Sequence, residues 1–174
     1  MVDDGSPLAW SSFVVAQGSA SRATIIHQLA VPHLVLWTSL DDESAGDTTE
    51  RLSGTGLFGE GTSRLPVGIV PVVKRSAISS SYAGMVTFGR GPECDVVLRH
   101  PGVSKVHAFI RRLGEMWIVT DAGSTNGTKV DGTKLTPNVG VELRSKSQVI
   151  LGRRVALEAF WPADLCERFG LGRR

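Results

Sequence analysis

The chain has 174 residues, of which 41% are hydrophobic and 21% charged, so it is long enough to bury a substantial core. Two cysteines without CxxC spacing argue against a disulfide framework, and neither they nor the four histidines predict a metal site or a cofactor. The apolar runs are about half of the roughly 20 residues that a membrane helix needs, and the acidic start shows no secretory signal. We therefore expect a cytoplasmic protein without a membrane partner.

The net charge of +2 conceals an asymmetry along the chain. Residues 1–65 carry 3 basic and 8 acidic side chains, net −5, whereas residues 66–174 carry 16 basic and 9 acidic side chains, net +7. This division indicates either an anionic ligand for the basic part or contact between the two parts. A solvated mixture of charges explains it equally well.

The first part of the chain predicts an extension, residues 1–40, made of a helix and a short strand. Residues 19–30, SASRATIIHQLA, have apolar side chains at helical spacing, with Ser21 as the N-cap and Pro32 as the stop. HLVLWTS, which comes next, has the composition of a strand.

Residues 41–66 are acidic, glycine-rich and without periodicity, which predicts a linker. GTGLFG, residues 54–59, matches a dinucleotide-binding fingerprint, but no strand precedes it and no helix comes after it. We therefore do not interpret it as a nucleotide site. The same linker contains Thr48 and Thr49 among acidic residues, and one hypothesis is that a kinase modifies one of them and that the product docks on the adjoining domain. The alternative is a solvated linker.

Residues 67–162 consist of short runs rich in Val, Ile and aromatic residues, separated by Gly, Pro, Asp, Asn or Ser. This pattern predicts an all-β domain, an antiparallel sandwich of about 10–11 short strands. Residues 163–174 are expected to form a C-terminal helical tail, with Pro162 near the helix start and Leu165 and Phe169 on one face.

Ser104 and His107 are three residues apart, so on a helix they would share a face and resemble a nucleophile and its base. VSKVHAFIRR alternates with a period of two, however, and in a strand such residues point to opposite faces. Ser104 also lacks the GxSxG context of a hydrolase. We expect Ser104 to end a loop, where its hydroxyl can donate to an anion, and His107 to hold that loop by hydrogen bonds.

Two further loops have the same character. Arg90 comes directly after a predicted strand and has a glycine on both sides, and residues 124–127 read Ser-Thr-Asn-Gly. Any one of these loops would be an ordinary hairpin, but the combination FGR…SKVH…STNGT resembles the forkhead-associated (FHA) domain. The resemblance covers roughly residues 68–160, and it implies the FHA-like sandwich that the strand pattern predicts independently.

The resemblance also implies roles for single residues. The phosphate- and peptide-contacting positions of the family fall on Arg90, Ser104, Lys105, Thr125 and Asn126. The positions that support the site fall on Gly89, His107 and Gly127. Of the contacting positions, Lys105 departs from the arginine that the family often has there.

FHA domains bind phosphothreonine peptides and have no catalytic activity, so the resemblance implies a module that recognises phosphothreonine-containing proteins in Ser/Thr protein kinase signalling, not an enzyme. Two alternatives remain open. One is a scaffold that keeps the fold without binding phosphate. The other is a basic β-domain that binds nucleic acid, against which few aromatic residues are interleaved with the charges.

Overall fold

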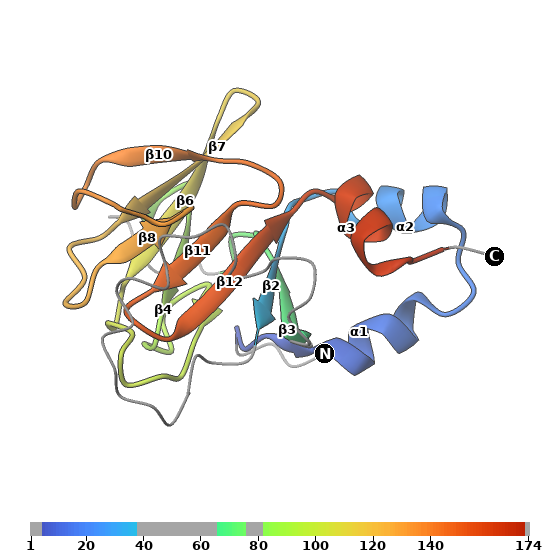
Figure 1. Ribbon diagram of the computed structural model, residues 1–174, viewed down its shortest axis with the longest axis horizontal. Coiled ribbons are helices and arrows are strands. Elements are labelled where there is room, and N and C mark those ends of the chain that lie inside the picture. The colour runs from blue at the N-terminus through green and yellow to red at the C-terminus, as the bar shows by residue number, and fades with distance from the viewer. Residues whose placement is uncertain (1–4, 38–65, 76–81, 173–174) are drawn as a thin grey trace.

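The computed structural model describes residues 5–37, 66–75 and 82–172, which form two packed β-sheets with three short helices at one end (Figure 1). The seven-stranded sheet has the order β1 (Leu8–Ala9), β3 (Pro66–Pro71), β2 (His33–Trp37), β12 (Val155–Phe160), β11 (Gln148–Leu151), β8 (Thr128–Val130) and β9 (Thr133–Lys134). The five-stranded sheet has the order β10 (Gly140–Leu143), β7 (Met116–Asp121), β6 (Ala108–Leu113), β4 (Met85–Gly89) and β5 (Val96–Val97). The predicted all-β sandwich is confirmed, with twelve strands in the described residues.

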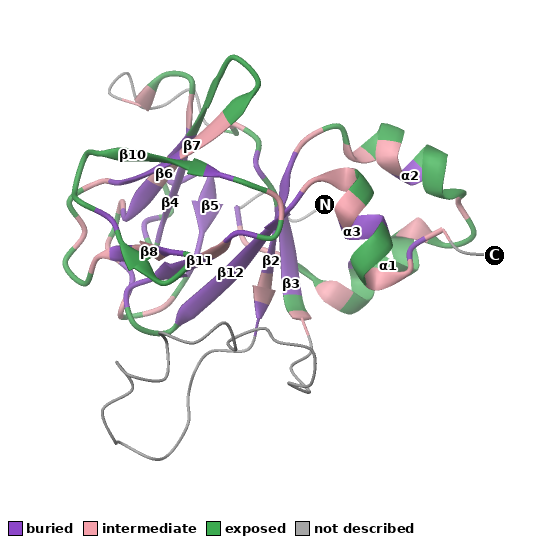
Figure 2. Ribbon diagram, turned by 45° about the horizontal axis from the view of Figure 1, so that its top comes forward, coloured by how far each residue is buried: buried purple, intermediate pink, exposed green. Residues whose placement is uncertain are grey.

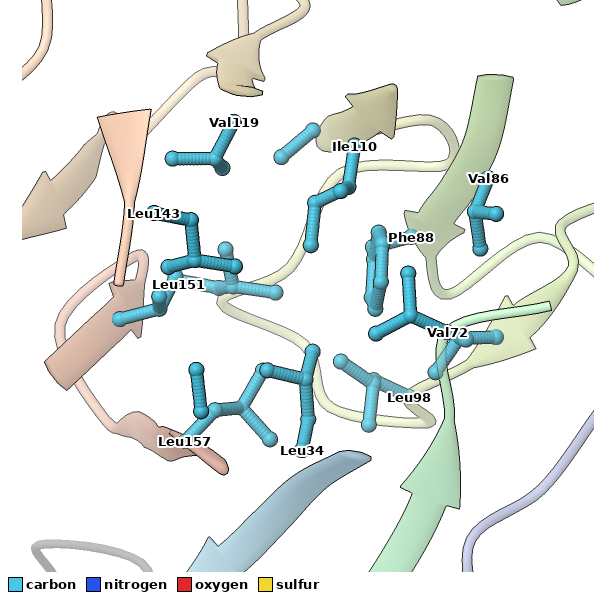
Figure 3. Packing of buried hydrophobic residues seen from close by; sticks show 14 of the residues in the cluster. Leu34, Val72, Val86, Phe88, Leu98, Ile110, Val119, Leu143, Leu151 and Leu157 are labelled. Atoms are coloured by element: carbon cyan, nitrogen blue, oxygen red, sulfur yellow. The ribbon is translucent and has the colours of Figure 1, made fainter. Parts of the chain in front are cut away.

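The main core lies between the two sheets, where side chains of both inner faces meet (Figure 3). Phe88 and Ile110 enter it from the five-stranded sheet, and Leu34, Leu151 and Leu157 from the seven-stranded sheet; each is at most 2% exposed. Burial of one such side chain contributes about 1.5–3 kcal/mol. The alternation seen in the sequence places Ile110 on this inner face and Arg111, its exposed neighbour, on the outer face.

Strand β2 lies inside the seven-stranded sheet, between β3 and β12, and pairs with both of them in antiparallel fashion. The strand that we expected in an N-terminal extension is therefore an inner strand of the sandwich. A domain boundary at residue 67, as expected from the sequence, would assign the paired strands β2 and β3 to different parts of the chain. The boundary itself stays a prediction. The predicted linker up to residue 65, with GTGLFG, Thr48 and Thr49, lies outside the described residues.

The helices cover the outer face of the seven-stranded sheet near β2 and β12 (Figure 2). They are α1 (Trp10–Gln17), α2 (Arg22–Leu29) and α3 (Pro162–Phe169). Helix α2 confirms the predicted cap, because the Ser21 hydroxyl accepts a hydrogen bond from the Thr24 N–H at 3.2 Å. Helix α3 begins at Pro162 as expected. In the described part of the chain, no helix is long and apolar enough to cross a bilayer.

Helix α1 was not predicted. Its sequence, WSSFVVAQ, has no side-chain cap and contains two valines, which have modest helix propensity. It is stabilised by a tertiary contact, because the Trp10 ring lies 4.3 Å from the ring of Phe169, centroid to centroid. Phe169 belongs to helix α3, which lies at the other end of the sequence.

One strand pair departs from the expected antiparallel arrangement, because β4 and β5 pair in parallel. Parallel neighbours usually require a long crossover, yet here the chain returns within the segment 90–95. The buried Asp95 carboxylate holds this tight return by accepting hydrogen bonds from the Thr87 N–H at 2.8 Å and the Thr87 hydroxyl at 2.9 Å. It also forms an ion pair with Lys74, with 2.9 Å between Nζ and Oδ2.

Glu158 on β12 is a buried carboxyl group on the helix-covered face of the seven-stranded sheet, with 7% of the residue exposed. Within the described residues, its Oε2 atom has no hydrogen-bond partner. Burial raises the pKa of Glu158 from 4.5 to about 7, although Arg168, the Trp37 side chain and Lys146 favour the ionised form. Glu158 is therefore a source of pH-dependent stability.

We expect Glu158→Gln to change how stability depends on pH. The unfolded chain releases the Glu158 proton near pH 4.5 and the folded chain near pH 7, so the folded state binds more protons between these values. The contribution of Glu158 to the free energy of unfolding is therefore largest below pH 4.5 and is lost as the pH rises to about 7. Allowing for screening by water, the loss is on the order of 2 kcal/mol.

Urea unfolding of both proteins between about pH 4.5 and pH 7.5, the window set by this shift, tests the expectation. Because His33 and His107 titrate alike in the two proteins, the difference between the curves isolates Glu158. The advantage of the wild type over the variant should shrink as the pH rises. If the two curves of unfolding free energy against pH run parallel, folding does not raise the pKa of the Glu158 carboxyl group.

Candidate functional site

The sequence-predicted site residues lie on three loops, which the fold joins by hydrogen bonds. The loop after β4 carries Arg90, the loop before β6 carries Ser104 and Lys105, and the loop between β7 and β8 carries Thr125 and Asn126. The first two loops are paired through the backbone: the Arg90 N–H donates to the Ser104 carbonyl at 2.9 Å, and the Gly91 N–H donates to the Lys105 carbonyl at 3.0 Å. The Arg90 loop therefore cannot move independently of the Ser104 loop.

The Ser104 side chain connects its loop to the Thr125 loop. The Thr125 N–H donates to the Ser104 hydroxyl oxygen at 3.1 Å, and the two hydroxyl oxygens lie 3.4 Å apart. The Ser104 hydroxyl is hydrogen-bonded to Thr125 and not to the His107 ring, whose Nδ1 accepts from the Ser104 backbone N–H at 3.0 Å. The pair therefore lacks the hydroxyl-to-imidazole bond that a nucleophile and its base require.

His107 is fully buried and connects two of the loops. Since Nδ1 accepts from Ser104, Nε2 carries the proton and donates to the Gly127 carbonyl at 3.1 Å. Burial lowers the pKa of His107, although the Gly127 hydrogen bond and the Asp121 charge act to raise it. Gly127 has a φ of +78°, a left-handed conformation that suits glycine. The neutral ring is the form that fits these two hydrogen bonds; that His107 and Gly127 support a binding site stays a prediction.

Gly89 lies where the Arg90 loop and the Lys105 backbone approach most closely. A Cβ atom at Gly89 would overlap the Lys105 carbonyl oxygen and would lie 2.8 Å from the Cys94 sulfur. The Cys94 thiol donates to the same carbonyl, with 3.1 Å between sulfur and oxygen. Burial, with the nearby charge of Glu93, raises the pKa of Cys94 to about 11, so the group stays a thiol and acts as a donor.

Asn126 is exposed, and its side-chain amide donates to the Gly102 carbonyl at 2.9 Å. This bond fixes the amide against the loop that leads to Ser104. The Gly102 backbone is further approached by Gly152, at which a Cβ would lie 2.5 Å from the Gly102 oxygen. Asn126 therefore has a defined direction at the rim of the site.

Asp121 is a residue that the sequence reasoning missed. It is 1% exposed, and its carboxylate accepts hydrogen bonds from the N–H groups of Gly123 and Ser124 and from the hydroxyls of Ser124 and Thr128, at 2.6–2.9 Å. Burial alone would raise the pKa of Asp121, but these hydrogen bonds lower it overall. The signal was present in TDAGSTNGT, because an Asp followed by Ser three residues later is typical of a side-chain-braced turn.

The surface of the site is cationic and offers hydroxyl groups. Arg90, Lys105, Thr125 and Asn126 are exposed, and Ser104 is half-buried. Considering the described residues alone, neither Arg90 nor Lys105 forms an ion pair with a carboxylate. No group of three His, Cys, Asp or Glu side chains suited to a metal ion occurs in that part of the chain either. The groups at this surface are donors, which suits an anionic ligand.

A family model described as the FHA domain matches residues 86–152, which include all three loops. The chain carries an FHA domain. The resemblance seen in the sequence is thereby confirmed, together with the fold that it implied. The match identifies the domain and not its ligand, so the binding roles of Arg90, Ser104, Lys105, Thr125 and Asn126 stay predictions.

Curated relatives match a part of this chain. The FHA domain-containing protein FhaB of Mycobacterium tuberculosis is 40% identical over 58 residues, which are 33% of this chain and 37% of that protein. The FHA domain-containing protein PS1 of Arabidopsis thaliana is 33% identical over 70 residues, 39% of this chain and 5% of that protein. The chain thus spans well under half the length of these relatives.

Among solved structures, the N-terminal FHA domain of S. cerevisiae Rad53p in complex with a phosphothreonine peptide is 22% identical. The superposed region covers 75% of this chain and 92% of the Rad53p chain, with a TM-score of 0.48.

We expect His107→Ala to lower the stability of the domain, because it leaves the Ser104 N–H and the Gly127 carbonyl without their buried partner. The loss should be about 2–4 kcal/mol in the free energy of unfolding, measured by urea titration. His27→Ala, at an exposed position on α2, is the control and should unfold like the wild type. Equal stability of the His107 and His27 variants would contradict the supporting role.

Gly89→Ala should separate the Arg90 loop from the Ser104 loop, because the added methyl group meets backbone that cannot yield. The amide protons of Arg90 and Gly91 should lose their protection in hydrogen exchange. Gly114→Ala serves as the control: no atom lies within 4 Å of its added methyl, so its cost is the left-handed φ alone, about 1–2 kcal/mol. Retained protection in Gly89→Ala would show that the close approach is not needed.

Proposed function

We propose that the domain binds phosphothreonine-containing segments of partner proteins at the three-loop site. The observation that carries this proposal is the arrangement of exposed Arg90 and Lys105 beside the Ser104 and Thr125 hydroxyls, on loops fixed to each other by hydrogen bonds. A rigid set of donors binds an anion without the entropy cost of ordering the loops. The FHA family match over the same residues supports the assignment.

The chemistry of each group suits a phosphate ester. A phosphothreonine carries about −1.5 to −2 charges and three acceptor oxygens. The Arg90 guanidinium can donate two parallel hydrogen bonds, and Lys105 adds a point charge at the rim. The hydroxyls of Ser104 and Thr125 can turn from each other to donate to the phosphate oxygens.

Asn126 supplies the recognition of the peptide itself. Its amide has one donor bonded to Gly102, so a second donor and the carbonyl oxygen are left for the backbone of a bound peptide. A preference for phosphothreonine over phosphoserine would come from a niche for the threonine methyl, worth about 1–3 kcal/mol. The partner would be a protein modified by a Ser/Thr protein kinase, and the domain would act as an interaction module without catalysing a reaction.

Arg90→Ala should remove most phosphopeptide binding, because a charged hydrogen-bond partner of the phosphate is lost. The cost is on the order of 2–5 kcal/mol, or roughly 30-fold and more in Kd, measured by calorimetry with a phosphothreonine peptide found by library screening. Ser104→Ala should cost less, since a single hydroxyl is lost. Arg111→Ala, at an exposed position on β6, changes the net charge equally and should bind like the wild type.

The same titrations distinguish the alternatives. Binding that is equal for phosphorylated and unphosphorylated peptides would indicate a phosphate-independent scaffold. Binding of oligonucleotides with a steep salt dependence, weakened equally by Arg90→Ala and Arg111→Ala, would indicate a nucleic-acid surface. Either result would refute the proposed function.

A further inference from the structure

The outer faces of the two sheets differ in character. The helices pack on the outer face of the seven-stranded sheet (Figure 2). The outer face of the five-stranded sheet instead presents apolar side chains that are exposed or half-buried, on strands β4, β6 and β7: Met85, Phe109, Leu113, Met116 and Ile118. Apolar side chains scattered singly over a surface are ordinary, but a contiguous group marks an interaction site. We call this group the apolar sheet face.

The apolar sheet face is ordered in rows, because directly paired residues of neighbouring strands point to the same side of a sheet. Ile110 and Val119 point into the core (Figure 3). Their neighbours along the strands, Arg111 and Ile118, therefore point outward. Arg111 pairs with Ile118, and Ile118 pairs with Glu142 on β10. The central row thus carries a cation and an anion on opposite sides of an apolar residue.

Both charged groups of the central row have capacity for a further partner. Arg111 is exposed, and in the part of the chain that the structure describes it forms no ion pair. Glu142 is exposed as well, and the two hydrogen bonds that it accepts from Arg144 both end on Oε2. Its Oε1 atom can therefore accept from a second arginine. Neighbouring strands lie about 4.8 Å apart, so Arg111 and Glu142 stand about 10 Å from each other across the row.

The central row is complementary to itself. If a second copy packs face to face about a two-fold axis along β7, each Arg111 lies opposite the Glu142 of the other copy, and Ile118 meets Ile118. A two-fold axis across the strands would instead place Arg111 opposite Arg111, which is repulsive. The charges therefore select the axis along β7. Packed sheets lie about 10 Å apart, a gap that an arginine and a glutamate side chain span together.

The rows on either side of the central row fit the same axis. In one row, Leu113 pairs with Met116, and these apolar side chains are 52% and 47% exposed. In the other row, Phe109 and Gly140 lie on opposite sides of β7, so the axis places each Phe109 over the Gly140 of the other copy. A Cβ atom at Gly140 would lie only 2.5 Å from Cγ2 of Ile118, so the Ile118 methyl covers this position. The Phe109 ring therefore meets apolar surface.

We propose that the apolar sheet face is the interface of a homodimer, in which two copies pack their five-stranded sheets face to face about a two-fold axis along β7. Two ion pairs between Arg111 and Glu142, one on each side of Ile118, set the alignment. The three-loop site lies at the ends of the strands and shares no residue with this interface. Because the axis runs along the strands, the dimer carries both three-loop sites at the same end. The proposal goes beyond the proposed function and does not depend on it.

Sedimentation velocity of the full chain, from about 1 μM to 1 mM, tests for the dimer over the range of weak and moderate affinities. The wild type should change from monomer to dimer as its concentration rises. Arg111→Glu and Glu142→Arg each create two like-charge pairs in the dimer, so each should raise the dissociation constant by about tenfold or more. Arg153→Glu and Glu167→Arg make the same charge changes at exposed positions elsewhere, and they should dimerise like the wild type.

A mixture of the two interface variants tests the arrangement itself. When Arg111→Glu meets Glu142→Arg, both ion pairs of the mixed dimer are restored with their signs exchanged. An equimolar mixture should therefore dimerise about as strongly as the wild type, although each variant alone does not. The double variant, with both substitutions in one chain, should also recover the dimer. Recovery in either case shows in addition that the substituted chains are folded.

Three results would overturn the proposal. If the wild type stays monomeric at every concentration, the apolar sheet face holds a different partner or none. If the wild type dimerises and both single variants dimerise equally well, the dimer uses another surface. If the single variants lose the dimer but neither the mixture nor the double variant recovers it, Arg111 does not face Glu142 across the interface.

Discussion

Two backbone hydrogen bonds, from Arg90 to Ser104 and from Gly91 to Lys105, set the geometry on which the rest of the candidate site depends. They require the chain after β4 to run against the chain before β6, and only a residue without a side chain fits at Gly89, where the two approach most closely. Because the bonds involve backbone atoms, the positions of the exposed side chains are fixed from within. The side chains themselves remain available for a ligand.

Buried polar groups also fix the loops, and each of them makes more than one hydrogen bond. The Asp121 carboxylate shapes the turn that carries Thr125, and His107 joins that turn to Ser104. Asp95 holds the return of the chain from Arg90 to β5. A buried polar group without partners costs free energy, but a satisfied one accepts few alternative arrangements. The apolar core beneath supplies the stability, and these groups supply the specificity of the loop geometry.

Much of the fold could be predicted because local rules and the tertiary structure agree. The capped helix α2, the strand alternation of β6 and the helix that starts at Pro162 were each evident from residue type and spacing. Helix α1 and the parallel pairing of β5 were not, since neither is favoured by its own sequence. Helix α1 depends on the contact between Trp10 and Phe169, and β5 on the bonds of Asp95 to Thr87.

The sequence by itself determined the kind of fold and the set of polar residues that the loops carry, because periodicity and turn chemistry act over a few residues. The tertiary structure alone decided that the Ser104 hydroxyl meets Thr125 and that His107 donates to Gly127. The physical reason is sheet register: hydrogen bonds between segments about 20 residues apart form only when the strands carrying those segments pair in one alignment. That alignment is set by whole strands burying one face against the core, not by the few residues of each loop.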